Sequence, residues 1–305
     1  MPAFPAEFGM PVRVDLVSSA PRKSERFYRE LMGWEYSAAG EGGGRRMAKL
    51  MGMPVSALFA ADSDEGGAGS GSNNADATNA APSATADQWR VNFHVDDVAS
   101  VVEKARGLGA GIALEPVELV DGGAMAVIVD PAGAMVGLLE QPGEQAFVAA
   151  GEPGAPVWFE LVAGQIDGFD DVVSFYHELF GWEIAVRART EEGVYAIAME
   201  AGAPFAGLVA GPQVTGPGEG ESFTGWLAYL GVENIGQAVL RTQELGGEVL
   251  VPVQDTEFGP LATIADPSGA TTVLCEVPLP PEEDARESDP LQNIDLSQFQ
   301  KGSPA

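Results

Sequence analysis

Four short stretches that alternate polar and apolar residues carry the side chains best suited to chemistry. In VRVDLV the polar positions are Arg13 and Asp15, and in RVNFHV they are Arg90, Asn92 and His94. Side chains of a strand alternate between its two faces, so each stretch would present its polar residues together. Two guanidinium groups with an amide and an imidazole suit an anionic ligand such as a carboxylate, a phosphate or an enolate, because arginine can bind such groups through paired hydrogen bonds.

Other roles for the same side chains remain open in the sequence. Asp15 can pair internally with an arginine while His94 serves as a hydrogen-bonded core histidine, which would make the whole set structural. Asp15 and His94 could also bind a divalent metal with the help of water. An open catalytic metal site normally has three protein ligands, so we favour no metal cofactor here.

The corresponding stretches of the second half, VWFELV and WLAYLGV, are more aromatic. Trp158 and Glu160 alternate in the first, and Leu227 and Tyr229 in the second, so all four would line one cavity. Burial in an apolar cavity would raise the pKa of Glu160, which suits general acid and base catalysis with Tyr229 as its partner. The carboxylate could instead hold a cationic or hydroxylated ligand beside the Trp158 ring, or simply accept a structural hydrogen bond.

The elements that must position these side chains repeat four times. Each alternating stretch is followed by a helical pattern with apolar residues at spacings of three and four, such as Phe27 with Leu31. The apolar strand positions, such as Val12, Val14 and Leu16, must then pack against these helices. A glycine, where a left-handed cap is expected, follows each of the predicted helices, which cover 24–32, 98–108, 170–180 and 235–245.

Two motifs occur once in each half of the chain and in the same order. FYRELMGWE at 27–35 returns as FYHELFGWE at 175–183, and DPAGA at 130–134 returns as DPSGA at 266–270. The second motif has the Asp, Pro and Gly spacing of a type I turn between two strands. The chain is therefore an internal duplication in which each half contains two βαβββ units, and the repeated nonapeptide belongs to the scaffold.

Composition narrows the choice of partners and compartment. The 305 residues are 45% hydrophobic and carry a formal charge of −29, with only 16 Lys and Arg. Such a charge repels nucleic acid and anionic membranes, and no run is long and apolar enough to span a bilayer. The single cysteine, Cys275, fits a reducing compartment, so we expect a cytoplasmic protein. The Gly/Ser/Asn-rich segment 61–88 should be disordered, and the acidic tail 279–305 should be mobile.

These motifs resemble the vicinal oxygen chelate superfamily, which includes glyoxalase I, the bleomycin resistance proteins and the extradiol dioxygenases. The resemblance covers about 10–141 and 155–278 and leaves 142–154 as a linker. It implies an α+β fold of four βαβββ modules in two glyoxalase-like domains, with curved mixed sheets that form cups and with helices outside. A ligand or a metal would lie inside a cup. The modules could pair within one chain or between two, so a monomer and a homodimer are both open.

The resemblance also implies where a metal would bind. Metal-dependent members place His, Gln or Glu at one position of a first strand and Glu on a last strand. The corresponding positions here hold residues that are not usual ligands, namely Arg13, Arg90, Trp158 and Leu227 on first strands and Gly137 and Val273 on last strands. We therefore expect metal-independent binding of a small organic ligand, such as a metabolite or an antibiotic. The alternative is a lyase, isomerase or dioxygenase, either metal-dependent through Asp15 and His94 or metal-free through Glu160 and Tyr229.

Overall fold

The computed structural model describes most of both halves of the chain. The described residues are 4–37, 45–61, 87–119, 122–143, 146–147, 151–211, 223–256 and 258–278. Most of the predicted insertion 61–88 and the whole predicted tail 279–305 lie outside these residues. Among the described residues, no helix is long and apolar enough to cross a bilayer.

The first half forms an eight-stranded mixed sheet in the order β3-β4-β5-β2-β6-β9-β8-β7. Its strands are β2 (Pro11–Ser18), β3 (Glu35–Tyr36), β4 (Arg45–Leu50), β5 (Met53–Ala60), β6 (Gln88–His94), β7 (Gly111–Glu118), β8 (Ala124–Val129) and β9 (Met135–Glu140). Strand β2 pairs antiparallel with β6 and parallel with β5, while β6 pairs parallel with β9. The first strands of the two βαβββ units therefore meet at the centre of the sheet.

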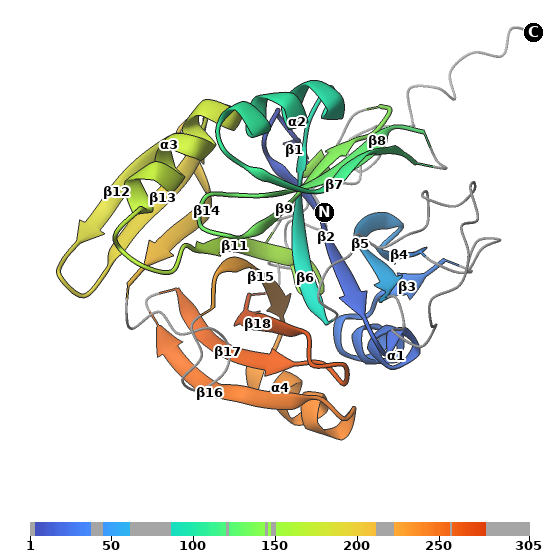
Figure 1. The fold of residues 1–305 in the computed structure, drawn as a ribbon. Coiled ribbons are helices and arrows are strands. Elements are labelled where there is room, and N and C mark those ends of the chain that lie inside the picture. The colour runs from blue at the N-terminus through green and yellow to red at the C-terminus, as the bar shows by residue number, and fades with distance from the viewer. Residues whose placement is uncertain are drawn as a thin grey trace, which may run out of the picture.

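The second half repeats this order as β12-β13-β14-β11-β15-β18-β17-β16. Its strands are β11 (Pro156–Val162), β12 (Glu183–Arg189), β13 (Val194–Glu200), β14 (Ala203–Ala210), β15 (Gly225–Val232), β16 (Glu248–Thr256), β17 (Gly259–Ala265) and β18 (Thr271–Glu276). A small sheet of β1 (Phe4–Pro5) and β10 (Ala146–Phe147) ties the N-terminal segment to the linker. Figure 1 shows the two large sheets next to each other, with β6 of the first beside β15 of the second.

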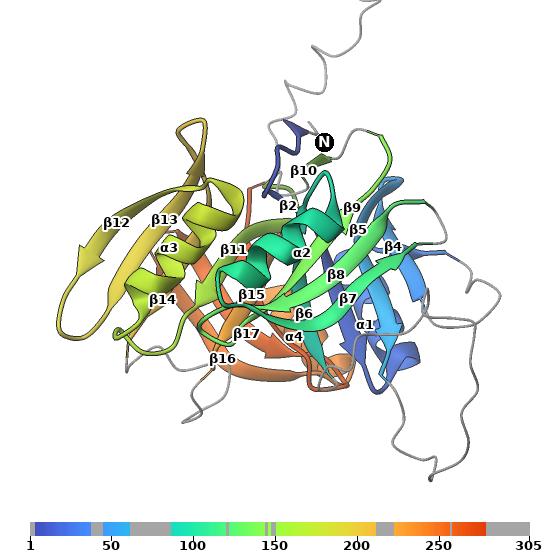
Figure 2. The same ribbon diagram turned by 45° about the horizontal axis from the view of Figure 1, so that its top comes forward.

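The helices of the described residues are α1 (Pro21–Met32), α2 (Val98–Gly107), α3 (Phe169–Phe180) and α4 (Ile235–Glu244). Figure 2 shows α2 and α3 side by side on the outside of the molecule. Helices α2 and α4 begin in the same way, because Asp97 and Asn234 each cap the amide of the third helical residue. Glu140 and Glu276, which end β9 and β18, each accept the first amide of the helix at 3.0 and 2.9 Å. The predicted α+β fold of four βαβββ units is thus confirmed.

The repeated nonapeptide packs its aromatic residues between the helices and the sheets. The Tyr28 ring stacks on Trp34 with centroids 5.3 Å apart, and the Tyr176 ring stacks on Trp182 at 4.8 Å. All four rings are buried, and rings of this size contribute much of the apolar area of a core. Helix-facing residues of both sheets belong to one hydrophobic cluster, so the two halves share a continuous core.

The same motif also forms hydrogen bonds between the halves. The Trp34 indole donates to the Gly154 carbonyl at 2.7 Å, just before β11, and the Trp182 indole donates to the Gly9 carbonyl at 2.9 Å, just before β2. Each half thus fixes the segment that leads into the first strand of the other. The nonapeptide therefore joins the halves as well as building each one.

A further contact between the halves is formed by Tyr176 but not by Tyr28, the corresponding residue of the first half. The Tyr176 hydroxyl donates to Asp130 of the DPAGA turn at 2.8 Å and accepts from the Trp226 indole at 2.9 Å. Its counterpart Tyr28 lies near Asp266 of the DPSGA turn and near the Trp89 indole, but no partner of the buried Tyr28 hydroxyl is in hydrogen-bonding geometry. The contact of α3 with the first half is therefore better satisfied than that of α1 with the second.

Candidate functional site

The faces of the two sheets that are turned away from the helices are the first and the second cup. In the first cup, Arg13, Asp15, Arg90 and Asn92 form a polar layer in which each residue is at most 3% exposed. Apolar clusters lie on both sides of this layer, one containing Val17, Ala57 and Phe59 and the other Val12, Leu119, Met125 and Leu139. The polar layer is therefore shielded from solvent. The first cup is thus filled by residues of the chain itself.

Asp15 lies at the centre of the polar layer. The Nε of Arg13 donates to its Oδ1 at 2.6 Å, and the Nη2 atoms of Arg13 and Arg90 donate to its Oδ2 at 3.1 and 3.2 Å. The Asn92 amide donates to the Arg13 carbonyl at 3.3 Å. The strand register explains these contacts, because Asp15 stands opposite Arg90 and Arg13 opposite Asn92. The internal pairing of Asp15 with arginine, one of the three interpretations left open by the sequence, is therefore present.

The single carboxylate of the polar layer faces two guanidinium groups, so the layer keeps a net positive charge. Burial alone would raise the pKa of Asp15, but Arg13 and Arg90 outweigh this effect and hold its pKa below the ordinary value. Burial also lowers the pKa of Arg90, and the Asp15 carboxylate opposes that shift. Arg13 Nη1 and Arg90 Nε make no hydrogen bond, so two donors for an anion exist here, and the Asn92 Oδ1 acceptor is also unpaired. The apolar clusters enclose them.

The residues at the positions expected for a metal do not fit a metal ion. A side chain at Gly137 would place its Cβ 2.0 Å from Asn92 Oδ1, so no ligand side chain has room there. The Asp15 carboxylate is already neutralised by two guanidinium groups, which repel a cation. Within the described part of the chain, no three His, Cys, Asp or Glu side chains come together as a metal site.

His94 lies away from the polar layer of the first cup. It ends β6 four residues beyond Arg90, which places the two Cα atoms about 13 Å apart along the strand. Its Nε2 is 3.6 Å from Asp96 Oδ1, and both residues line a surface cavity of about 280 Å³ together with Glu140. The structure therefore does not bring His94 next to Asp15, as a joint metal site would require.

The second cup keeps its predicted residues accessible. Trp158, Glu160, Leu227 and Tyr229 are each partly exposed. Strand β11 pairs with β15 so that Trp158 stands opposite Tyr229 and Glu160 opposite Leu227. The Tyr229 hydroxyl donates to Glu160 Oε1 at 3.0 Å. Glu160 and Tyr229 thus form a hydrogen-bonded pair on a face of the sheet that is only partly shielded from solvent.

Sequence reasoning missed other members of the second cup. Gly207 stands opposite Glu160 in the pairing of β14 with β11, and a Cβ there would lie 2.9 Å from the Tyr195 hydroxyl and 3.2 Å from Glu160 Oε2. Cys275 on β18 is near enough to Tyr229 to affect its ionisation. A signal was present in the sequence, because alternation along VYAIAME separates Tyr195 from the alanines that face the helices. The absence of a side chain at Gly207 lets the Tyr195 hydroxyl and the Glu160 carboxyl approach the same point.

The electrostatic environment of Glu160 differs from that of Asp15. Burial raises the pKa of Glu160, and the hydrogen bond from Tyr229 opposes this shift only in part. Burial and then the nearby carboxyl group also raise the pKa of Tyr229, so its phenol remains a donor at neutral pH. No Lys, Arg or His of the described residues pairs with Glu160. This pair can therefore exchange a proton at Glu160 or neutralise a cation.

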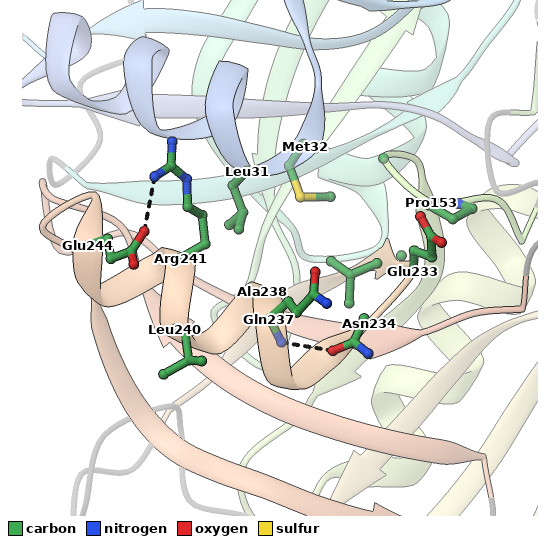
Figure 3. A pocket seen from close by; sticks show the side chains of 13 residues that line it. Leu31, Met32, Pro153, Glu233, Asn234, Gln237, Ala238, Leu240, Arg241 and Glu244 are labelled. Carbon is green, nitrogen blue, oxygen red and sulfur yellow. Dashed lines mark hydrogen bonds and ion pairs between the residues drawn. The ribbon is translucent and has the colours of Figure 1, made fainter.

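A larger groove lies between α1 and α4, outside both cups (Figure 3). Its volume is about 690 Å³, and its wall includes Leu240, which is 62% exposed. Asn234 in this groove caps the Gln237 amide at 2.8 Å, and Arg241 pairs with Glu244 at 3.0 Å. Arg241 also pairs with Glu30 of α1 at 2.7 Å. These polar groups are already paired within α4 and between α4 and α1, so the groove offers less fixed chemistry than the second cup.

Two mixed sheets, each built from two βαβββ units that meet at their first strands, define a two-domain protein of the glyoxalase-like class. Residues 12–139 match the family described as "Glyoxalase-like domain", and residues 161–274 match the "Glyoxalase/Bleomycin resistance protein/Dioxygenase superfamily". The chain therefore belongs to this superfamily, also called the vicinal oxygen chelate superfamily, and contains two tandem glyoxalase-like domains.

Relatives extend over most of the chain. "Putative glyoxylase CFP32" of Mycobacterium tuberculosis (strain CDC 1551 / Oshkosh) is 27% identical over 266 residues, which cover 86% of this chain and 92% of that protein. Anthracycline biosynthesis protein DnrV of Streptomyces peucetius is 29% identical over 189 residues, which cover 62% of this chain and 66% of that protein. The Mn(II)-bound glyoxalase from Novosphingobium aromaticivorans has a TM-score of 0.56 at 14% identity, covering 89% of this chain and 83% of that one. This last likeness shows the fold alone.

Proposed function

We propose that this chain binds a small organic molecule in its second cup through its own side chains, without a metal. The observation that carries the proposal is the contrast between the cups: Asp15 is fully buried, whereas Glu160 at the corresponding strand position is partly exposed. Ligand cavities are mostly apolar and contain a few polar groups that fix the orientation of the ligand. Trp158, Leu227 and the hydrogen-bonded pair of Glu160 and Tyr229 have this composition.

The relatives support a ligand of low molecular mass. The name of DnrV refers to anthracycline biosynthesis, and that of CFP32 to a glyoxylase. We carry over from these names only that the ligand is a small metabolite or an antibiotic. The formal charge of −29 disfavours nucleic acid and anionic lipid as partners.

An acid–base enzyme, such as a lyase or an isomerase, is the second candidate, and the environment of Glu160 favours it. A carboxyl group whose pKa is raised by burial is suited to take a proton from a substrate and return it. Tyr229 would orient that carboxyl group through its hydrogen bond. A metal-dependent reaction at Asp15 and His94 gains no support, because the two residues lie apart.

Ligand-dependent shifts in melting temperature test the proposal. The wild type is screened against a panel of metabolites and aromatic antibiotics, and each hit is repeated with Leu227→Trp, which fills the second cup. The matched control Leu240→Trp fills the groove between α1 and α4 instead. We expect hits to stabilise the wild type and the control but not Leu227→Trp. A shift lost only in the control would place the ligand in the groove and overturn the proposal.

Product formation distinguishes the acid–base enzyme from a protein that only binds its ligand. Each hit is incubated with the wild type and with Glu160→Gln, and product formation is followed by mass spectrometry. Conversion by the wild type that stops in Glu160→Gln, while the thermal shift persists, would establish acid–base catalysis. Binding without conversion in both proteins would establish a binding protein.

A further inference from the structure

The second cup contains a carboxyl group that has no cation to pair with in the described structure. Glu160 accepts a hydrogen bond from Tyr229, and no Lys, Arg or His of the described residues approaches it as an ion-pair partner. A carboxylate removed from water is costly unless it is paired, and otherwise it becomes protonated. The free protein therefore lacks a positive charge at this position.

In the first cup, the carboxylate at the same strand position is paired with cations. Asp15 and Glu160 are both the fourth residue of their alternating stretches, VRVDLV and VWFELV. Asp15 receives one guanidinium group from two residues earlier on its strand and one from the residue opposite. In the second cup those two positions are Trp158 and Leu227. The second cup has a carboxyl group at the same strand position, but uncharged side chains stand where the first cup has its two cations.

Aromatic side chains surround this carboxyl group. Trp158, Tyr195 and Tyr229 are partly exposed on the cup face, and the space at Gly207 lets the Tyr195 hydroxyl and the Glu160 carboxyl approach each other. Aromatic faces attract organic cations, and a carboxylate adds an ion pair with charge-assisted hydrogen bonds. The chain as a whole, with a formal charge of −29, also attracts cations from solution.

We infer that the ligand of the second cup is an organic amine, whose ammonium group pairs with Glu160 and whose apolar body lies against Trp158. The inference rests on the proposed function, because it names the chemical class of the ligand that the second cup takes. An anionic ligand would meet a like charge at this site, and a neutral ligand would gain no ion pair. The charge of the amine should contribute on the order of tenfold to a hundredfold in affinity.

The pH dependence of binding has a definite sign. The titratable groups that face Glu160 are the phenols of Tyr229 from β15 and Tyr195 from β13, and Cys275 of β18 lies near Tyr229, while the facing position on β14 is Gly207. Burial raises the pKa of Glu160 in the free protein, so an amine should bind more tightly as the pH rises and Glu160 loses its proton. A neutral ligand that accepts a hydrogen bond from protonated Glu160 would show the opposite trend.

Three probes of one shape and different charge test the inference: naphthylmethylamine, naphthylmethanol and naphthoate. The Kd of each for the full chain is measured by isothermal titration calorimetry between about pH 6 and pH 8, where the amine stays protonated. The variant Glu160→Gln removes the charge while keeping the shape and an acceptor for Tyr229. The matched control Glu244→Gln removes a carboxylate from α4, outside the second cup.

We expect naphthylmethylamine to bind the wild type at least about tenfold more tightly than naphthylmethanol, with naphthoate weakest. This preference should disappear in Glu160→Gln and persist in Glu244→Gln. If naphthylmethanol binds as tightly as the amine and Leu227→Trp abolishes its binding, the inference is wrong and the proposed function stands. If no probe binds, or if Leu227→Trp leaves all binding unchanged, the proposed function fails and the inference with it.

Discussion

Replacing Asp15 by asparagine should destabilise the protein strongly, because two buried guanidinium groups share this carboxylate. Arg13 and Arg90 are 3% and 2% exposed, so water cannot take over the role of the lost charge. Removing one partner of a buried ion pair typically costs about 3–5 kcal/mol. The expected loss is a large part of a total stability of about 5–15 kcal/mol.

Urea unfolding followed by tryptophan fluorescence measures this loss, as a lower midpoint at an unchanged slope. Asp96→Asn is the matched control, because Asp96 is 81% exposed and such surface changes usually stay within about 0.5 kcal/mol. The pKa of Asp15 is lowered in the folded protein, so its contribution is present above its ordinary pKa and is lost as the pH falls through the lowered value. The difference between Asp15→Asn and the wild type should therefore be constant above about pH 5 and shrink in stronger acid.

An Asp15→Asn protein within about 1 kcal/mol of the wild type at neutral pH would refute this reasoning. A triple variant, Arg13→Met with Asp15→Leu and Arg90→Met, separates charge from packing. It removes all three charges together, so it should recover most of the stability that the single variant loses. If it were as unstable as the single variant, poor packing rather than unpaired charge would be the cause.

Three further predictions concern the second cup and the contacts between the halves. Gly207→Ala should weaken ligand binding about tenfold or more, measured by calorimetric titration, because its Cβ would lie 2.9 Å from the Tyr195 hydroxyl and force that group and Glu160 apart. Tyr176→Phe should lose about 1–3 kcal/mol in thermal denaturation, because it leaves a buried carboxyl oxygen and an indole unpaired. Its counterpart Tyr28→Phe removes a buried hydroxyl that has no partner in hydrogen-bonding geometry, so it should lose less stability than Tyr176→Phe. Glu160→Gln should gain stability relative to the wild type as the pH rises, measured as melting temperatures from about pH 4 to pH 8. The pKa of Glu160 is raised in the folded protein, so ionisation of its carboxyl group destabilises the wild type, whereas glutamine does not ionise.

Each of these predictions has a result that would contradict it. Wild-type affinity in Gly207→Ala would mean that the Tyr195 hydroxyl does not contribute to the site. Equal losses in the two tyrosine variants would mean that the halves are held together symmetrically. A constant difference between Glu160→Gln and the wild type at every pH would mean that Glu160 is ionised as easily in the fold as in the unfolded chain.

Strand alternation predicted which side chains lie together, but it did not predict how far they are buried from solvent. It placed Arg13 with Asp15 and Trp158 with Glu160, because the two-residue period of a strand follows from the backbone alone. Whether such a face is open depends on side chains that arrive from other strands. The first cup is filled by residues such as Phe59, from a strand far from Asp15 in the sequence, and alternation in VRVDLV contains no information about them.

Register between strands was the second feature that the sequence did not specify. Alternation assigned Val12 to the helix side, but a bulge beside it turns it toward Met125 and Leu139 in the first cup. Tyr195 and Gly207 acquire a role only when β13 and β14 lie next to β11. The fold itself was predictable, because two motifs repeated in the same order identify the units without any knowledge of register.

The reciprocal hydrogen bonds of Trp34 and Trp182 have a consequence for how the two halves can evolve. Each half offers the same donor to the same kind of segment in the other, which is the arrangement of a two-fold symmetric dimer. In a dimer of identical subunits every substitution would occur in both cups at once. Joining the halves in one chain removes this restriction, so one cup can accumulate buried ion pairs that support the fold while its copy changes freely with the ligand it meets.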